Sequence, residues 1–184
     1  MWKRRSIGCT APRGPRPSAV WPEEAFAHDF NNLLMTVQGN VYMMLQETPG
    51  LMENKPVPNA GLKRVETILI VDDDESVLAI ATEMIRHIGF EAIGVDGGKA
   101  AVALFEKEKE KIVLVVLDII MPDMGGGETF DRLRSIDPDV KVLLASGYSA
   151  DDHAKTILAR GAMGFLQKPF TLEAFKKKLE ECLA

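Results

Sequence analysis

Polar side chains that could carry out chemistry stand at four places in this chain, each directly after a short apolar run. They are the acids at 72–74, Asp118, Ser146 and Lys168. Each of them alone is most often a turn, cap or surface residue. A short, unbroken run of Val, Leu and Ile is typical of a strand buried on both faces of a parallel sheet, and ligands bind at the carboxyl ends of such strands. Together, the four positions therefore predict a pocket that holds acids, a hydroxyl and an ammonium group.

The chain from residue 67 onward alternates strand-like runs with helical patterns. The expected strands are 67–71, 91–95, 112–118, 141–145 and 164–167. The expected helices are 76–88, 98–107, a short helix after the loop 122–127, 150–159 and a last helix that places Leu172, Phe175, Leu179 and Cys182 on one stripe. This alternation predicts an α/β fold, a doubly wound five-stranded parallel sheet. Right-handed crossovers favour the flavodoxin-like strand order 2-1-3-4-5.

Some polar residues of this region are better explained by local structure. Asp74 and Glu75 are interpreted mainly as the cap and first-turn acid of the next helix. His87 and His153 have no polar company in the sequence and are interpreted as ordinary exposed helix residues.

Residues 67–184 resemble a response-regulator receiver domain of two-component signalling, of the kind found at the C-terminus of hybrid sensor histidine kinases. The matching positions are Asp72, Asp73, Asp118, Ser146, Phe165 and the pair Lys168-Pro169. The resemblance implies that Asp118 accepts a phosphoryl group and that Lys168 and Ser146 bind the phosphoryl oxygens. It also implies a cis Lys168-Pro169 bond. Ser146 and Phe165 are then the switch residues, which reshape the surface of the fourth helix, fifth strand and fifth helix of this domain.

A magnesium ion is the expected cofactor of this pocket. Carboxylates that converge at strand ends repel one another, and a hard cation neutralises such a cluster. Mg²⁺ prefers oxygen ligands and keeps several waters, so Asp73, Asp118 and the backbone carbonyl of Ile120 would suffice, with Asp72 holding a metal-bound water. Asp118 would act as a nucleophile on phosphorus, and the phosphoryl group would come from outside the chain.

Two positions beside the pocket predict how the phosphorylated form behaves. Gly147 leaves the site open to an incoming partner histidine, and Ile120 offers no polar group to orient an attacking water. We expect slow self-dephosphorylation, with a sensor histidine kinase or a histidine phosphotransfer protein exchanging the phosphoryl group.

Residues 22–47 predict an amphipathic helix that extends the domain at its N-terminal side. Trp21-Pro22-Glu23-Glu24 suits a helix start, and one apolar stripe follows with spacings of three, four and seven. The string around His28, at 26–34, resembles the H-box of sensor histidine kinases, which makes His28 a possible second phosphosite. The ATP-binding domain that follows in that family has no counterpart here, so we expect no autokinase activity and do not classify the chain as an enzyme.

The remaining N-terminal residues predict little structure. Residues 1–21 are a basic, proline-rich leader, and 48–66 are a linker with prolines and glycines. No apolar run approaches the ~18 residues that span a bilayer, and no apolar segment of a signal peptide is present. Two distant cysteines and a net charge of -5 favour a cytoplasmic protein that does not bind nucleic acid.

Three readings of the function stay open. The first is a phosphoacceptor receiver in a phosphorelay, whose output is contact with an unknown downstream protein. The second is a truncated hybrid kinase fragment, in which His28 is phosphorylated in trans and relays to Asp118. The third is a non-catalytic docking module, with dimerisation through the first helix. A phosphatase of the haloacid-dehalogenase type would need a second acid where this chain has Ile120.

Overall fold

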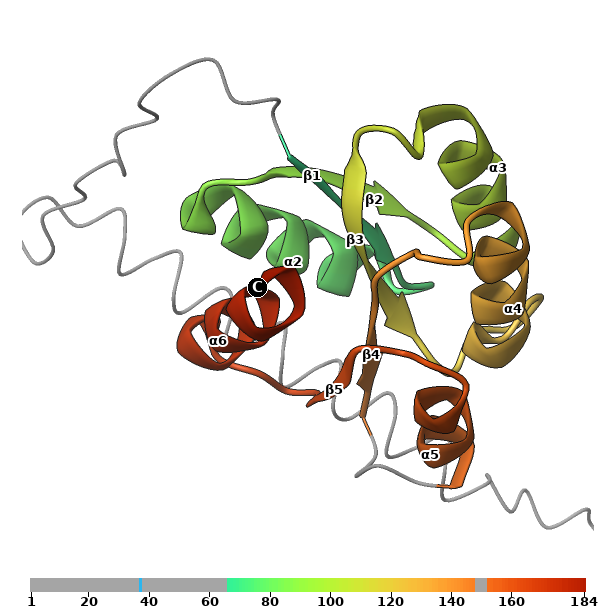
Figure 1. The fold of residues 1–184 in the computed structure, drawn as a ribbon. Helices are drawn as coiled ribbons and strands as arrows, with labels where there is room; N and C mark the ends of the chain where they lie inside the picture. The colour runs from blue at the N-terminus through green and yellow to red at the C-terminus, as the bar shows by residue number, and fades with distance from the viewer. Residues whose placement is uncertain (1–36, 38–65, 148–151) are drawn as a thin grey trace, which may run out of the picture.

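A parallel five-stranded sheet forms the centre of the molecule, with the strand order β2-β1-β3-β4-β5 (Figure 1). The computed structural model describes residue 37 and residues 66–147 and 152–184. The strands are β1 (Thr67–Val71), β2 (Glu91–Val95), β3 (Ile112–Asp118), β4 (Val142–Ser146) and β5 (Gly164–Gln167). The helices are α2 (Glu75–Ile88), α3 (Gly98–Glu108), α4 (Gly126–Ile136), α5 (Asp152–Ala159) and α6 (Leu172–Leu183). The doubly wound α/β fold predicted from the sequence is confirmed.

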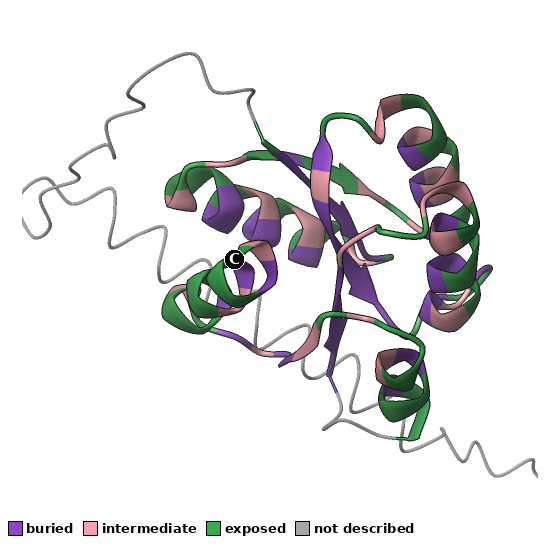
Figure 2. Ribbon diagram, in the orientation of Figure 1, coloured by how far each residue is buried: buried purple, intermediate pink, exposed green. Residues whose placement is uncertain are grey.

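The helices cover both faces of the sheet. Helices α2 and α6 lie on one face, and α3, α4 and α5 lie on the other (Figure 1). Each face has its own apolar cluster, and the clusters meet at the strands, whose side chains alternate between them. Strands β1, β3 and β4 are therefore buried along almost their whole length (Figure 2). Cys182 is buried, as its place on the apolar stripe predicted, and it packs in the cluster on the α2 side.

Local signals in the sequence determine where α2 begins and ends. The side chain of Asp74 accepts hydrogen bonds from the backbone N–H groups of Ser76 and Val77, as expected of an N-cap residue. At the other end, Gly89 has a φ of 111°, in the left-handed region that residues with a Cβ adopt only at a cost. Asp74 thus serves as the N-cap of α2.

The predicted bounds of the elements are close to those observed, with two informative differences. Strand β4 runs one residue further than predicted, to Ser146, because the Ser146 carbonyl accepts a hydrogen bond from the Lys168 N–H at 2.7 Å. Helix α2 begins one residue earlier than predicted, at Glu75, directly after the cap. Helix α5 begins at Asp152 among the described residues, and the predicted start at residue 150 lies outside them.

Most predictions for the N-terminal third lie outside the described residues. These are the leader at 1–21, the linker at 48–66, and His28 in the helix predicted at 22–47. Val37, on the apolar stripe of that predicted helix, is helical and 52% exposed. Among the helices that the structure describes, none is long and apolar enough to cross a membrane.

Candidate functional site

Three carboxylates meet where β1 and β3 end. Asp72 and Asp73 follow the last residue of β1, and Asp118 is the last residue of β3. Because the strands are adjacent and parallel, with Val71 in register with Leu117, their carboxyl ends bring these side chains together. One carboxylate oxygen from each of the three acids lies within 4.8 Å of the others. Asp72 and Asp118 are buried, and Asp73 is exposed, so the cluster opens to solvent on one side.

Lys168, after the carboxyl end of β5, neutralises part of this cluster at the same edge of the sheet. It follows β5 and is only 1% exposed. Its Nζ lies 2.5 Å from Oδ2 of Asp72 and 3.2 Å from Oδ1 of Asp118. The Lys168-Pro169 peptide bond is cis, as predicted. The sheet order therefore brings together three of the four sequence positions that pointed to a pocket.

The electrostatics of the buried groups reflect this crowding. Burial, together with the negative charge of Asp118, raises the pKa of Asp72 to about 6, although the Lys168 ammonium opposes the rise. Burial disfavours the charged form of Lys168, but the charges of Asp118 and Asp72 outweigh it and raise the lysine pKa above its ordinary value. The lysine is therefore charged at neutral pH, and one ammonium faces two buried acids.

Ser146, the fourth predicted position, ends β4 at the same edge of the sheet. It is buried, and the residue before it, Ala145, is the register partner of Asp118. The Ile119 N–H donates to the Ala145 carbonyl at 3.1 Å and links the two strand ends. Phe165 lies on β5, partly buried and packed against the apolar cluster under α3, α4 and α5. Ser146 thus ends its strand next to the strand that carries Asp118, while the ring of Phe165 belongs to the neighbouring helical layer.

Two glycines that the sequence interpretation missed fix the loop after β3. A Cβ at position 126 would lie 2.5 Å from the Asp118 carbonyl oxygen and 2.7 Å from the Ile119 Cα. Instead the Gly126 N–H donates to the Ile119 carbonyl at 2.9 Å. A Cβ at Gly98 would meet the hydroxyl of the buried Thr129 at 2.1 Å. The run of three glycines at 125–127 indicated a loop, but not this close contact with the strand.

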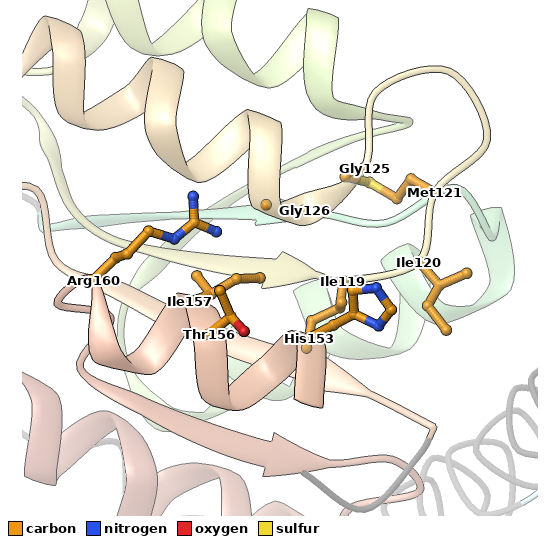
Figure 3. A pocket seen from close by; sticks show the side chains of 10 residues that line it. Ile119, Ile120, Met121, Gly125, Gly126, His153, Thr156, Ile157 and Arg160 are labelled. Atoms are coloured by element: carbon orange, nitrogen blue, oxygen red, sulfur yellow. The ribbon is translucent and has the colours of Figure 1, made fainter. Parts of the chain in front are cut away.

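A cavity of about 570 Å³ lies beside the acid cluster, between the loop after β3 and helix α5 (Figure 3). His153 is exposed, as predicted, but its ring also lines this cavity, so the interpretation of His153 as an ordinary surface residue was incomplete. The residues that line the cavity are Ile119, Ile120, Met121, Gly125, Gly126, Gly127, His153, Thr156, Ile157 and Arg160. The cavity and the acid cluster thus share the stretch of backbone directly after Asp118.

The donor set of the acid cluster fits a hard divalent cation. All three side chains offer oxygen, the ligand type that Mg²⁺ prefers. Two of the acids are buried next to each other, with one lysine between them, so a further positive charge would lower their mutual repulsion.

Comparison with known proteins agrees with this geometry. Residues 68–180 match the family described as the response regulator receiver domain. The chain belongs to this family. Receiver domains of this kind act in two-component systems and bind Mg²⁺ through acidic residues, and an acid cluster is present here.

The relatives are longer proteins that contain a similar domain. The sensor kinase CckA of Brucella abortus is 30% identical over 148 residues, which cover 73% of this chain and 16% of that protein. The transcriptional regulatory protein ZraR of Klebsiella oxytoca is 36% identical over 118 residues, covering 64% of this chain and 26% of the regulator. Among solved structures, a CheX–CheY–BeF₃–Mg²⁺ complex from Borrelia burgdorferi aligns with a TM-score of 0.62 and 26% identity, covering 65% of this chain and 90% of that one.

The chain spans about a sixth to a quarter of the length of these two relatives. The match to the sensor kinase covers 73% of this chain, which is more than residues 67–184 alone. The match therefore also includes some residues before position 67.

Proposed function

We propose that this chain accepts a phosphoryl group on Asp118 from the phosphohistidine of a sensor histidine kinase or of a histidine phosphotransfer protein. The observation that carries the proposal is the contact of Lys168 with two buried acids at one sheet edge, Nζ to Asp118 at 3.2 Å and to Asp72 at 2.5 Å. A buried triad of this kind is costly to fold, which makes it a marker of a functional site. The reaction belongs to the cytoplasm, where such donors act.

The chemistry follows from the positions of the charges. A carboxylate oxygen of Asp118 attacks phosphorus, the bond from phosphorus to the donor imidazole nitrogen breaks, and the electron pair of that bond returns to the ring. Lys168 stabilises charge on the phosphoryl oxygens, and the Ser146 hydroxyl donates a hydrogen bond to one of them. Mg²⁺, held by Asp73, Asp118 and the Ile120 carbonyl with Asp72 through a water, would offset the repulsion between carboxylate and phosphoryl group.

The output of phosphorylation is a change in the surface formed by α5, β5 and α6. Lys168 leaves part of its pairing with Asp72 to bind the new phosphoryl oxygens, and Ser146 moves toward them. Phe165 is partly buried in the adjoining apolar layer, where a change in its rotamer alters that surface. The shift in population between the two states then presents a different surface to a downstream protein.

Labelling with acetyl phosphate tests the proposal directly. After incubation with acetyl phosphate and Mg²⁺, intact mass should show one phosphoryl adduct on the native chain and none on Asp118→Asn. The control is Asp139→Asn, an exposed acid before β4, at the opposite edge of the sheet, which should label like the native chain. An adduct that persists in Asp118→Asn, or that forms equally well in excess chelator, would contradict the assignment of the site.

The lifetime of the acyl phosphate tests the role of Ile120. The side chain of Ile120 is 40% exposed and has no group that could orient a water. Replacing it with Asn supplies such a group, so we expect the acyl phosphate of Ile120→Asn to decay several-fold faster than the native one, measured by loss of the adduct after removal of acetyl phosphate. Ile120→Val is the matched control and should decay at the native rate. A native acyl phosphate that decays within seconds would contradict the prediction.

A second candidate function concerns the N-terminal residues. The resemblance of residues 26–34 to an H-box supports a division into a leader at 1–21, an H-box helix at 22–47, a linker at 48–66 and a receiver at 67–184. In this reading His28 is phosphorylated in trans and relays to Asp118. ATP-dependent phosphorylation of the Asp118→Asn chain by a separate histidine kinase, abolished by His28→Gln, would establish it, and an unlabelled Asp118→Asn chain would exclude it.

A further inference from the structure

The cavity between α4 and α5 has the size and lining of a small-molecule site. Its volume of about 570 Å³ falls within the roughly 300–1,000 Å³ typical of pockets that hold such ligands. One wall is apolar and consists of Ile119, Ile120, Met121 and Ile157. These side chains suit a flat apolar group better than water. None of the three acids lines the cavity, which shares with the phosphorylation site only the stretch of chain directly after Asp118.

The described residues of the lining carry charge of one sign only. None of the described residues that line the cavity is acidic, although the chain as a whole carries a net charge of -5. The polar side chains around it are His153, Thr156 and Arg160. Figure 3 shows Arg160 and His153 at opposite ends of the cavity. The first turn of α4, at Gly126 and Gly127, adds the positive end of a helix dipole to the wall. An anionic group is therefore favoured over a cationic one.

Arg160 is held in position to bind such a group. Its Nη1 pairs with both carboxylate oxygens of Asp131, at 2.6 and 2.5 Å, and its guanidinium lies 5.7 Å from the centre of the Phe130 ring. The other terminal nitrogen, Nη2, faces Gly127, where a Cβ would lie 3.3 Å from it. The ion pair therefore fixes one side of the guanidinium and directs the other toward the glycine wall.

Gly127 keeps the cavity open at this end. A Cβ there would contact the Ile157 side chain at 3.8 Å as well as Arg160, so a longer side chain at this position would occupy the space between α4 and α5. Gly127 is the second residue of α4, where an alanine would be compatible with the helix. The helix itself gives no reason for a glycine at this position.

We propose that this cavity binds a small aromatic carboxylate. The carboxylate accepts hydrogen bonds from Nη2 of Arg160 at the glycine end, and the ring lies along Ile157 and Ile119 toward His153. The ligand would contact the backbone directly after Asp118, so its binding is coupled to the loop that carries the Ile120 carbonyl.

Titration with 2-naphthoate, followed by amide chemical shifts of the full chain, tests the proposal without any phosphorylation. We expect saturable shifts centred on 119–127 and 153–160, and weaker binding of the neutral isostere 2-naphthamide. Arg160→Gln should weaken 2-naphthoate binding about tenfold, as expected for loss of a charge-assisted hydrogen bond, and leave 2-naphthamide binding unchanged. The matched control is Arg132→Gln, which removes an exposed arginine of α4 that pairs with Glu128 outside the cavity, and should bind like the native chain.

Filling the cavity gives an independent test. Gly127→Met should abolish binding of both probes while its amide spectrum stays that of a folded protein. Equal binding of 2-naphthoate to Gly127→Met and to the native chain would overturn the proposal. So would shifts that map elsewhere, or the absence of binding at several millimolar probe. If Gly127→Met does not fold, the Arg160→Gln comparison and the shift map decide the matter alone.

Discussion

At the scale of single residues, the site consists of charged groups whose burial would be unfavourable for each alone and becomes acceptable when they are in contact. Asp72, Asp118 and Lys168 are each at most 2% exposed. Burying a charge without a partner costs several kcal/mol, which is comparable to the free energy of unfolding of a whole domain. The lysine contacts both acids, so each member of the triad makes the burial of the others possible.

Removing the lysine should therefore destabilise the fold. Without Mg²⁺, we expect Lys168→Met to lower the free energy of unfolding by about 3 to 5 kcal/mol, because two buried carboxylates lose their cation. Mg²⁺ should restore part of this loss, since it supplies positive charge to the same acids. Urea unfolding with and without the metal measures both effects. The control is Lys99→Met, whose ammonium forms an exposed ion pair with Asp123 at 3.4 Å and should leave the stability unchanged. A Lys168→Met protein as stable as the control would contradict this account of the triad.

The residues of this triad were predictable because their chemistry is visible in the sequence. Asp118 and Lys168 each follow an apolar run, and parallel strands place such ends on one edge. Gly126 was not predictable in the same way, because its role depends on how closely α4 approaches the strand. His153 was missed as a cavity residue for a related reason, since its sequence neighbours carry no sign of the loop packed opposite it.

At the scale of elements, one close contact determines where α4 sits relative to β3. The absence of a side chain at Gly126 lets the first turn of α4 lie against the backbone of Asp118 and Ile119. On the other side, the Thr129 hydroxyl donates to the Gly125 carbonyl at 3.0 Å and packs into the space left by Gly98. The helix is thereby fixed to β3 and α3, and with it the loop beside Asp118.

Gly126→Ala should disturb this arrangement. A Cβ 2.5 Å from the Asp118 carbonyl oxygen forces backbone to move, and we expect a loss of about 1–3 kcal/mol in stability together with several-fold slower labelling by acetyl phosphate. The neighbouring Gly125→Ala is the matched control, because its Cβ would meet only the Ile119 carbonyl oxygen at 3.8 Å, and its φ of -65° suits any residue. Thermal unfolding and labelling rates measure the two effects. Equal behaviour of the two variants would show that the close approach has no consequence.

The ends of these elements were predicted well from the sequence where a single residue type marks the end. Asp74 begins α2 as the expected N-cap, and a glycine, Gly89, ends it in the left-handed region. The end of β4 was predicted one residue short, because the hydrogen bond from the Lys168 N–H to the Ser146 carbonyl joins segments that are distant in sequence. The hydrophobic periodicity of a segment indicates which of its side chains are buried. It does not indicate which distant backbone group forms the last hydrogen bond of the strand.

At the scale of the whole molecule, the fold and the metal make opposite demands on the acid cluster. The fold is favoured when Asp72 is neutral, because burial and Asp118 raise its pKa to about 6. Binding of Mg²⁺ favours the ionised form, because a negative charge at Asp72 attracts the cation and accepts a hydrogen bond from a metal-bound water. The metal-free protein should therefore become more stable as the pH falls toward 5, whereas the metal-bound protein should show little dependence on pH in this range.

Without Mg²⁺, Asp72 should stabilise the protein as the pH falls. The folded state takes up a proton near pH 6, whereas the unfolded state does so near 3.8, so this group adds about 1 kcal/mol of stability between about pH 7 and pH 5. The Lys168 pKa is raised from 10.5, so the lysine stays protonated throughout this window. With Mg²⁺ present, the affinity for the metal should fall about tenfold over the same window, and the stabilisation that depends on the metal should fall with it.

Urea unfolding at the two pH values, with and without Mg²⁺, measures both slopes, and Asp72→Asn isolates the contribution of this carboxyl. The difference in stability between the native chain and Asp72→Asn should depend on pH in the metal-free protein and should become nearly independent of pH in excess Mg²⁺. If the stability difference between the native chain and Asp72→Asn is the same at both pH values without Mg²⁺, Lys168 lowers the pKa of Asp72 more than burial raises it. The acid would then be ionised in the folded protein well below pH 6, and the site would be prepared for the metal at the lower pH as well.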